Sequence, residues 1–227
     1  MKLEINKNEV LRYLGYKNQE YSQELDLIID EMREEIIRIA DYRYTYKIVE
    51  LNKDEAGSVS LKEGILPLTG ENIQKHLQNS KYAVIMAATL GVELEKRLNY
   101  YGKVDLTRNL ILDSCGTQMI EEVCDGIEEE VKDKLGPGYY YTFRYSPGYG
   151  DYPISVQKQL VNFLDGYRRI GLTVTPSNLL LPRKSVTAIM GVQTEPYASE
   201  FDRCGACLAR EYCKFRKEGT RCYSKKD

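Results

Sequence analysis

One periodic segment constrains the fold of this chain more than any other feature. Between Leu106 and Leu135, apolar residues recur every three or four positions, and acidic residues fill many of the positions between them. The apolar positions are Leu112, Cys115, Met119, Val123, Ile127, Val131 and Leu135. This spacing predicts a single long amphipathic helix. Gly136, Pro137 and Gly138 should end it, because glycine readily closes a helix and proline cannot continue one.

Helices and strands are both expected elsewhere in the chain. The segment Ala83–Leu90 is almost wholly apolar and too short to cross a membrane, which favours a buried strand. Further strands are expected at 44–51, 139–145, 179–181 and 185–192, and further helices at 6–14, 22–40, 92–100 and 156–163. Cys115 and Cys124 lie within the long helix and are expected to pack in the core rather than to carry chemistry.

The single histidine and the net charge exclude two classes of function. His76 lies among polar residues and is expected on a helix surface, which leaves no candidate for a Ser-His-Asp or Cys-His mechanism. The net charge of −2 offers no positive excess for a nucleic-acid backbone. With neither a signal-peptide pattern nor an apolar run long enough to span a membrane, the chain is expected to be cytoplasmic. Its cysteines should then be thiols, metal ligands or redox groups.

The stretch R-Y-S-P-G-Y-G-D-Y-P, residues 144–153, fits neither a helix nor a strand pattern. Arg144 offers a planar fork for a carboxylate, and Tyr149 offers an aromatic face for a cation or a flat heterocycle. Gly148 and Gly150 let a ligand approach the main chain. S-adenosylmethionine has a carboxylate, a cationic centre and an adenine, and would use all three features. The alternative is a tyrosine-rich turn with a surface arginine.

This stretch and the residues after it resemble the activation domain of cobalamin-dependent methionine synthase. R-Y-S-P-G-Y is similar to the R-x-x-x-G-Y signature of that family, and Pro153 follows a few residues on, as it does there. A helical segment comes next, and then I-G-L-T-V-T-P-S-N-L-L-L-P-R-K-S-V, residues 170–186. That segment matches the family's order of I-G-x-x-(L/V)-T-x-S, a proline and A-S-V. The long acidic helix before the signature also fits the family layout.

The resemblance implies an α+β fold of the activation-domain type, with a twisted, mostly antiparallel sheet and long flanking helices. It also implies that the domain binds S-adenosylmethionine and acts once the cobalamin of the enzyme has been oxidised to cob(II)alamin. An electron is then supplied, and the resulting cob(I)alamin takes the methyl group. Because cob(I)alamin is a strong nucleophile and the sulfonium a good leaving group, no catalytic residue is expected, and the protein supplies binding and orientation.

The resemblance also assigns ligand-contacting residues. Arg144 should meet the methionyl carboxylate, Ser146 stands where the family uses main-chain contacts, and Gly148 and Tyr149 should shape the pocket. A glutamate on the preceding long helix contacts the ligand in the family, and Glu121 is the match here; its alternative role is a solvated helix face.

The sequence departs from the family in several respects. The family's aspartate near the start of the domain has no clear counterpart, and Ile189-Met190-Gly191 replaces an aromatic cluster, leaving Tyr197 as a substitute. No cobalamin-binding module is recognisable. The expectation is therefore a stand-alone reactivation factor, a methyltransferase component rather than a complete enzyme. Its partners would be a corrinoid-binding methionine synthase module and an electron donor protein, with no nucleic acid and no membrane.

The composition changes after Phe201, which predicts a ligand-binding domain at 1–200 and a cysteine-rich tail at 201–227. The tail contains Cys204, Cys207, Cys213 and Cys222 in the spacing C-x2-C-x5-C-x8-C. Four thiolates can hold an iron–sulfur cluster or a structural zinc ion. Free or redox-active thiols are the third alternative. A cluster would suit electron delivery to cobalamin, because thiolate-ligated clusters reach low potentials.

Two further functions compete with reactivation. One is a non-catalytic module that binds S-adenosylmethionine or docks on a corrinoid protein, with zinc holding the tail. The other is a radical S-adenosylmethionine enzyme, which the cysteine order disfavours because the expected C-x3-C-x2-C pattern is missing.

Overall fold

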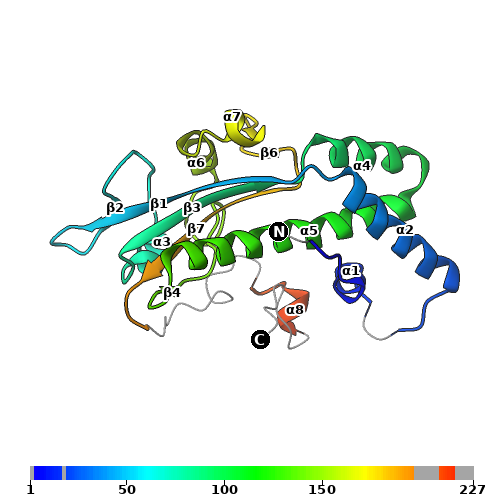
Figure 1. The fold of residues 1–227 in the computed structure, drawn as a ribbon, viewed down its shortest axis with the longest axis horizontal. Helices are drawn as coiled ribbons and strands as arrows, with labels where there is room; N and C mark the ends of the chain where they lie inside the picture. The colour runs from blue at the N-terminus through cyan, green and yellow to red at the C-terminus, as the bar shows by residue number, and fades with distance from the viewer. Residues whose placement is uncertain (1–2, 17–18, 197–209, 218–227) are drawn as a thin grey trace.

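In the computed structural model, residues 3–16, 19–196 and 210–217 are described. They form an elongated α+β structure in which a central sheet lies between two layers of helices (Figure 1). The helices are α1 (Lys7–Tyr13), α2 (Gln23–Ile39), α3 (Glu71–Leu77), α4 (Val92–Val104), α5 (Leu106–Leu135), α6 (Gln157–Phe163), α7 (Gly166–Ile170) and α8 (Lys214–Lys217), with a 3-10 turn at Ile154–Val156.

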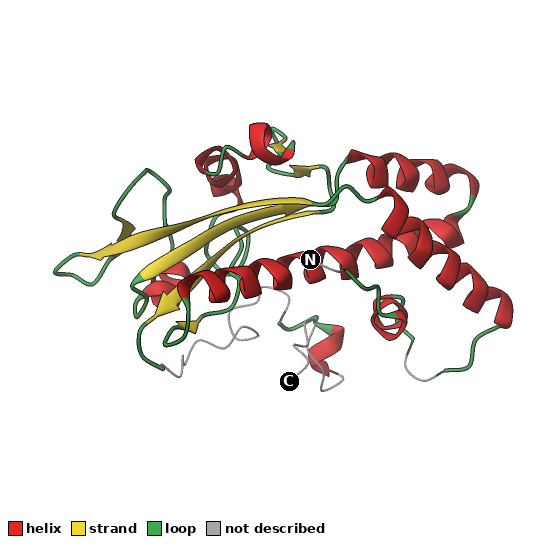
Figure 2. Cartoon of the chain, in the orientation of Figure 1, coloured by secondary structure: helices red, strands yellow, loops and turns green. Residues whose placement is uncertain are grey.

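The main sheet has five strands in the order β2-β1-β3-β7-β4, and all of its pairings are antiparallel. Figure 2 shows the three long strands side by side across the middle of the molecule. The strands are β1 (Arg43–Lys53), β2 (Val59–Leu61), β3 (Tyr82–Thr89), β4 (Tyr140–Tyr141) and β7 (Ser185–Gln193), and β5 (Thr173–Val174) pairs with β6 (Leu180–Leu181) in a separate small sheet. The central position of β3 explains its apolar sequence, because both of its faces are buried.

Helix α5 lies along one face of the sheet and packs against α1, α2 and α4 as well. Its apolar stripe meets β3 and β7 in a core that includes Val84, Met86 and Met190. Cys115 and Cys124 are fully buried in this core, as the periodicity predicts. The segment 106–135 is a single helix with the expected bounds, because its amphipathic pattern agrees with its burial along the whole length. Among the described helices, none combines the length and apolarity needed to cross a bilayer.

The opposite face of the sheet is covered by α3, α6 and α7. Ala83, Ile85 and Ile189 point to this side and meet the fully buried Tyr145 and Tyr152. The two cores are therefore separated by the sheet, and successive residues of β3 and β7 alternate between them.

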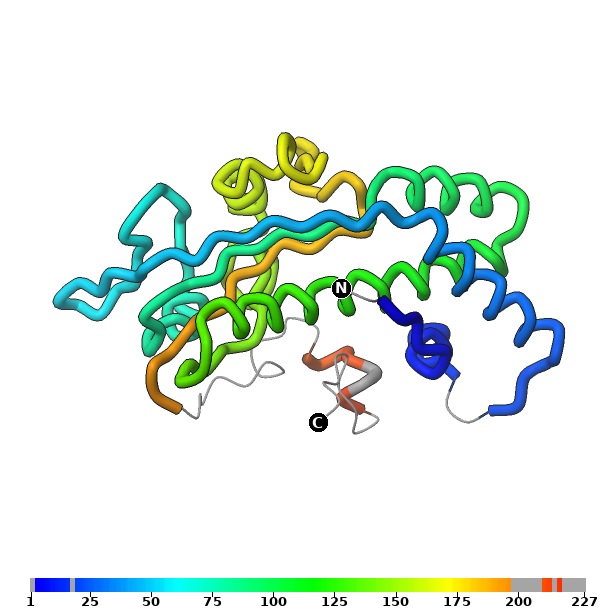
Figure 3. The backbone as a smooth tube through the Cα atoms, in the orientation of Figure 1, coloured from blue at the N-terminus to red at the C-terminus, as the bar shows by residue number. Residues whose placement is uncertain are grey.

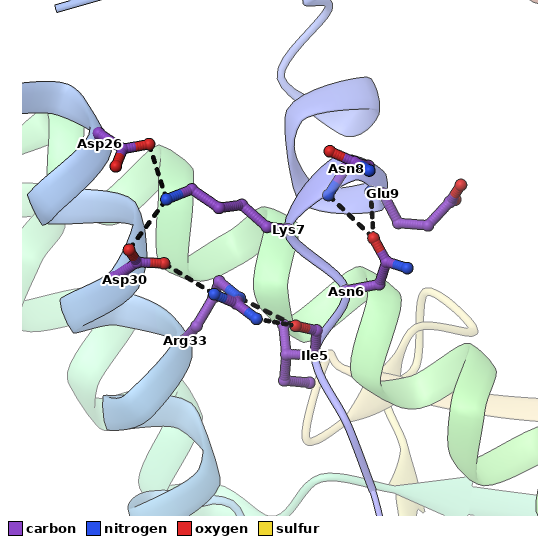
Figure 4. A network of polar contacts seen from close by, with 8 residues as sticks. All are labelled: Ile5, Asn6, Lys7, Asn8, Glu9, Asp26, Asp30 and Arg33. Carbon is purple, nitrogen blue, oxygen red and sulfur yellow. Dashed lines mark hydrogen bonds and ion pairs between the residues drawn. The ribbon is translucent and has the colours of Figure 1, made fainter. Parts of the chain in front are cut away.

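The N-terminal segment runs past α5 before it enters α1 (Figure 3). Gln118 of α5 donates to the carbonyl of Glu4 at 3.4 Å, and Ile5 is buried beside it. Figure 4 shows how polar contacts hold this segment to α2: Arg33 donates to the Ile5 carbonyl through Nε at 2.8 Å and Nη2 at 2.6 Å. Lys7 pairs with Asp26 and Asp30 in the same network (their contacts are 2.6 Å and 2.9 Å).

Two sequence predictions need correction. The predicted surface position of His76 is wrong: the side chain is buried, with its ring 4.6 Å from that of Phe143 and its Nε2 2.8 Å from Oγ1 of Thr142. Its neighbours Lys75 and Gln78 are exposed, whereas the imidazole packs against the rings of Phe143 and Tyr145. The predicted strand at 139–145 is shorter, with β4 covering Tyr140–Tyr141 alone.

Candidate functional site

Arg144 joins the motif at 144–153 to helix α5. Its Nη1 donates to Oδ1 of Asp125 at 2.7 Å and to Oε1 of Glu128 at 2.6 Å. Its Nη2 donates to Oε2 of Glu121 at 2.7 Å. These are charge-assisted hydrogen bonds that a guanidinium, which stays protonated at any ordinary pH, donates to carboxylates. The structure therefore brings together Arg144 and Glu121, the two residues that the family resemblance predicts to contact one ligand.

Asp125 and Glu128 are two members of this cluster that the sequence analysis did not identify. With Glu121 they follow the spacing i, i+4, i+7, which places all three on one face of α5. That spacing was visible in the sequence, but nothing local showed that an arginine would cross it. Burial differs along the row: Glu128 and Arg144 are 6% and 8% exposed, whereas Glu121 and Asp125 are 34% and 41% exposed.

A one-residue shift in pairing turns Arg144 toward α5. Tyr140 and Tyr141 pair with Gln193 and Val192, and continuing this register would place Arg144 opposite Ile189. Instead Tyr145 lies opposite Ile189, and the two residues exchange both backbone hydrogen bonds at 2.8 Å. One extra residue before Tyr145 is a β-bulge, which redirects the side chains that follow it. Tyr145 thus enters the core with Ile189, and Arg144 points to the other side.

The backbone after Arg144 forms a compact turn. The N–H of Tyr149 donates to the carbonyl of Ser146 at 3.1 Å, and the N–H of Gly148 donates to the carbonyl of Tyr152 at 2.8 Å. Gly148 has φ +91°, a left-handed conformation that favours glycine. Tyr149 is about half exposed, and its ring lies 6.0 Å from that of Tyr145.

Asp151 fixes this turn to α3. Its Oδ2 accepts from the N–H of Glu71 at 2.7 Å, and its Oδ1 accepts from the N–H of Asn72 at 3.1 Å. The N-cap residue of α3 is Gly70, which has no side chain to do this. Asp151 therefore supplies the cap of a helix that begins 80 residues earlier in the chain.

Gln118 lies near the middle of α5, one turn before Glu121. Its Nε2 donates to Oε1 of Glu122 at 2.9 Å, while its Oε1 is buried and accepts no hydrogen bond from the described residues. The side chain is 3% exposed. A buried acceptor without a donor costs free energy, so this oxygen would gain from an N–H or O–H brought to it.

The predicted metal ligands fall mostly outside the part of the chain that the structure describes. Cys204, Cys207 and Cys222 lie outside the described residues. The predicted domain boundary near 200 and Tyr197 lie outside them as well. Cys213 is described and half-buried just before α8. Within the described ranges, no group of three or more His, Cys, Asp or Glu side chains could hold a metal ion.

No protein-family model matches the chain, and no curated protein sequence matches it. Among solved structures, 13 chains match. One of them is described as the crystal structure of the MetH reactivation domain bound to AdoHcy, with a TM-score of 0.59 and 13% sequence identity. The superposition covers 97% of this chain and 85% of that chain. This likeness confirms the expected fold, a mostly antiparallel sheet with long helices, over nearly the whole length.

Proposed function

We propose that this chain binds S-adenosylmethionine at the Arg144 cluster and acts in the reactivation of a cobalamin-dependent methionine synthase. The observation that carries the proposal is the fold, shared over 97% of the chain with a MetH reactivation domain bound to AdoHcy. AdoHcy is what remains of S-adenosylmethionine after its methyl group has left. The contact between Arg144 and Glu121 supports the same ligand, because the family resemblance assigns both residues to it.

The residues present suit an amino-acid head group. A guanidinium binds a carboxylate through two parallel hydrogen bonds, and carboxylates bind an ammonium. Arg144 and Glu121 place these two complementary charges 2.7 Å apart. The turn at Ser146 and Gly148 offers main-chain groups, and the half-exposed ring of Tyr149 offers a face on which a flat heterocycle can stack.

Reductive methylation of cobalamin by S-adenosylmethionine requires this protein to bind and orient the methyl donor, without acid or base catalysis. A low-potential one-electron donor reduces cob(II)alamin to cob(I)alamin, whose electron pair forms the Co–C bond as the C–S bond breaks and AdoHcy leaves. No proton moves in this balance, which agrees with a site built from an arginine and carboxylates. His76, the only histidine of the chain, is buried against Thr142 instead. The protein's contribution is to hold the methyl group toward the partner's cobalt and to exclude water.

The proposal has two further parts. The chain acts in trans, as a reactivation factor for a corrinoid module on another protein. Its tail, through Cys204, Cys207, Cys213 and Cys222, holds an iron–sulfur cluster that receives the electron, with a structural zinc ion as the alternative occupant. The C-x2-C-x5-C-x8-C spacing supports four-thiolate ligation. Anaerobic purification followed by iron, sulfide and zinc analysis distinguishes the two occupants, and protein free of all three would refute tail ligation.

Calorimetric titration with S-adenosylmethionine tests the binding site. Arg144→Lys keeps the charge but loses the planar fork, so its affinity should fall at least about tenfold. Arg43→Lys is the matched control, because Arg43, at the start of β1, forms an exposed pair with Asp41. Circular dichroism would establish that both variants are folded. No detectable binding by the wild-type chain, or equal affinity in Arg144→Lys, would refute the assignment.

A methyl-transfer assay then separates reactivation from binding alone. The chain is mixed with a cob(II)alamin-loaded corrinoid module, a low-potential reductant and S-adenosylmethionine, and the absorbance of methylcobalamin is followed. Methylcobalamin formation that depends on the chain supports reactivation in trans. Tight binding without turnover would instead support the non-catalytic binding module.

A further inference from the structure

Thr142 is the last residue that follows the β4–β7 register before the bulge. Its N–H donates to the carbonyl of Gly191 at 3.0 Å. The N–H of Gly191 then donates at 2.7 Å to the side-chain oxygen Oγ1 of Thr142. In an ordinary antiparallel pair a backbone carbonyl accepts this second hydrogen bond. The side chain of Thr142 therefore completes the pair at the point where the strand leaves its register, shortly before Arg144.

His76 holds the hydroxyl of Thr142 in place. Its Nε2 lies 2.8 Å from Oγ1 of Thr142, and the side chain is 3% exposed. A hydroxyl has one proton to donate, and of the two acceptors within reach Nε2 is closer than the carbonyl of Phe143 at 3.4 Å. The hydrogen-bond network thus assigns the hydroxyl as the donor and Nε2 as the acceptor. His76 is then a neutral imidazole with its proton on Nδ1.

The β7 side of this pair is fixed by close packing. A Cβ added to Gly191 would clash with Oγ of Ser80 and would lie 3.2 Å from Cδ2 of Leu77. Leu77 ends α3, and Ser80 follows the turn after it. Gly191 therefore lies directly against the helix that carries His76. Thr142 is the member of the pair whose position depends on a side-chain hydrogen bond.

Helix α3 holds both ends of the segment that contains the candidate ligand-binding motif. His76, near the C-terminal end of the helix, contacts Thr142, and the first N–H groups of the helix are capped by Asp151. Four residues of the candidate site lie between these two contacts: Arg144, Ser146, Gly148 and Tyr149. The geometry of this segment therefore depends on α3 as well as on the sheet.

We propose that His76 and Thr142 form a positioning pair for the ligand-binding arginine. Their hydrogen bond fixes the start of the bulge and thereby the direction in which Arg144 points. The proposal rests on the proposed function, because it explains how the guanidinium is held for its ligand. His76 packs with Tyr145 in the core on the α3 side of the sheet, whereas Arg144 meets α5 on the other side. His76 acts through the backbone that links Thr142 to Arg144.

Orientation decides how much such a pair contributes to binding. A guanidinium binds a carboxylate through two parallel hydrogen bonds, which weaken together when the fork is turned. A displacement of about 1 Å can cost as much as a hundredfold where function depends on orientation. Loss of the hydroxyl of Thr142 leaves Nε2 of His76 and the N–H of Gly191 without this partner, so the start of the bulge can shift.

Calorimetric titration with S-adenosylmethionine tests the role of the hydroxyl. Thr142→Val keeps the shape of the side chain and removes the hydroxyl, and its affinity should fall about tenfold. Thr142→Ser restores the hydroxyl and should bind with nearly wild-type affinity. Thr187→Val is the matched control, because Thr187 on β7 also donates a buried hydrogen bond, to Oε1 of Gln157 at 3.0 Å. The control should lose stability and keep its affinity.

A double-mutant cycle tests whether the two residues act as a pair. His76→Phe keeps an aromatic ring in the core and removes Nε2, so its affinity should fall about as far as that of Thr142→Val. The double variant should fall little further, because residues that act through one hydrogen bond are not additive. Circular dichroism would establish that each variant is folded. Additive losses in the double variant would overturn the pairing.

NMR of the protein without ligand gives a second, independent readout. The chain has one histidine, so nitrogen-15 labelling of histidine gives a single pair of ring signals. In the wild type, Nδ1 should carry the proton and Nε2 should not. The guanidinium signals of Arg144 should change in Thr142→Val and return in Thr142→Ser, because the hydroxyl fixes the direction of the arginine.

The outcomes separate this proposal from the proposed function. Equal affinity of Thr142→Val and the wild type would overturn the positioning role and leave ligand binding intact. An equal loss of affinity in Thr187→Val, or a proton on Nε2, would also overturn it. If the wild type binds no S-adenosylmethionine, the proposed function fails. Unchanged Arg144 signals in Thr142→Val would overturn the positioning pair whether or not the ligand binds.

Discussion

Oε1 of Glu128 lies 2.6 Å from Nη1 of Arg144, and both side chains are less than a tenth exposed. Two charges in this position have lost most of their hydration and depend on each other. When one partner of a buried ion pair is removed, the other remains as an uncompensated charge, which costs more than the pair contributes. The contact therefore joins the functional motif to α5 and also supports the fold.

Replacing Glu128 by glutamine should lower the free energy of unfolding by about 2 kcal/mol, because the buried guanidinium loses one of its charged partners. Urea unfolding measures this. The control is Glu129→Gln, which removes the neighbouring exposed glutamate and should change stability by less than about 0.5 kcal/mol. Equal losses of unfolding free energy in the two variants would show that the buried contact stabilises the protein no more than an exposed ion pair does.

The cap that Asp151 supplies to α3 from a distant part of the chain gives a second prediction about stability. Asp151→Ala removes both acceptors for the first N–H groups of α3 and should destabilise the protein by about 1 kcal/mol, whereas Asp151→Asn keeps one acceptor and should cost less. Hydrogen exchange of Glu71 and Asn72 reports the change directly. Unchanged protection of these amides in Asp151→Ala would contradict the capping role.

The two cysteines of α5 should be chemically inert. Burial raises the pKa of the Cys115 thiol to about 12, and burial likewise raises the pKa of the Cys124 thiol to about 12. Because the thiolate is the reactive form, alkylation of the native protein near neutral pH should spare both. Peptide mass spectrometry after labelling, with and without denaturant, checks this. Labelling of Cys115 or Cys124 as fast in the native as in the denatured protein would contradict the burial.

Features that depend on residues within one segment could be predicted from the sequence, whereas features that depend on contacts between distant segments could not. The helix at 106–135 and the strand at 83–90 follow from periodicity and apolar content, and both agree with the structure. His76 was misplaced because its neighbours along the chain are polar, while its burial comes from Phe143 and Thr142, contributed by a distant segment. Local polarity reports the average environment of a helix and not the direction of one side chain.

The candidate site likewise combines residues that the sequence identifies with residues that depend on distant contacts. The family resemblance assigns Arg144 through the R-x-x-x-G-Y signature and Glu121 as the glutamate on the preceding helix, and the structure places the two in contact. Asp125 and Glu128 were missed, because their link to Arg144 depends on the bulge before Tyr145. A bulge arises from a mismatch between two strands that are far apart in sequence, so neither strand alone reveals it.

Two tyrosines on β1 should make stability depend on pH in the alkaline range. The hydrogen bond to Glu130 and burial raise the pKa of Tyr44 to about 12, and burial and the same glutamate raise the pKa of Tyr46 to about 12. A folded-state pKa above the ordinary value of 10 means that this stabilisation is complete below about pH 10 and is lost as pH rises through about 12. The variant Tyr44→Phe with Tyr46→Phe should therefore lose stability less steeply across that window.

Urea unfolding at several pH values measures this slope. Tyr167→Phe is the control, since Tyr167 is well exposed, and it should follow the wild-type slope. If the double variant and the wild type lose stability in parallel, the shared contact with Glu130 does not control the ionisation of these tyrosines.

The turn at Gly150 should tolerate no side chain. Gly150 has φ +52°, and a Cβ there would lie 2.5 Å from the hydroxyl of Tyr145 and 2.5 Å from Nδ2 of Asn72. Tyr145 is fully buried and cannot move aside, so alanine would meet both backbone strain and a steric clash. Gly136→Ala separates the two effects, because Gly136 also has a positive φ, +78°, with nothing within 4 Å of an added Cβ.

Gly136→Ala should cost about 1 kcal/mol of unfolding free energy from left-handed strain alone, and Gly150→Ala should cost about 1–3 kcal/mol more from overpacking. The clash also displaces Tyr145, which pairs with Ile189 next to Arg144, so ligand affinity should fall in Gly150→Ala and remain at the wild-type level in Gly136→Ala. Equal stability of the two variants would show that Tyr145 can yield, and the loop would then be less constrained than its contacts imply.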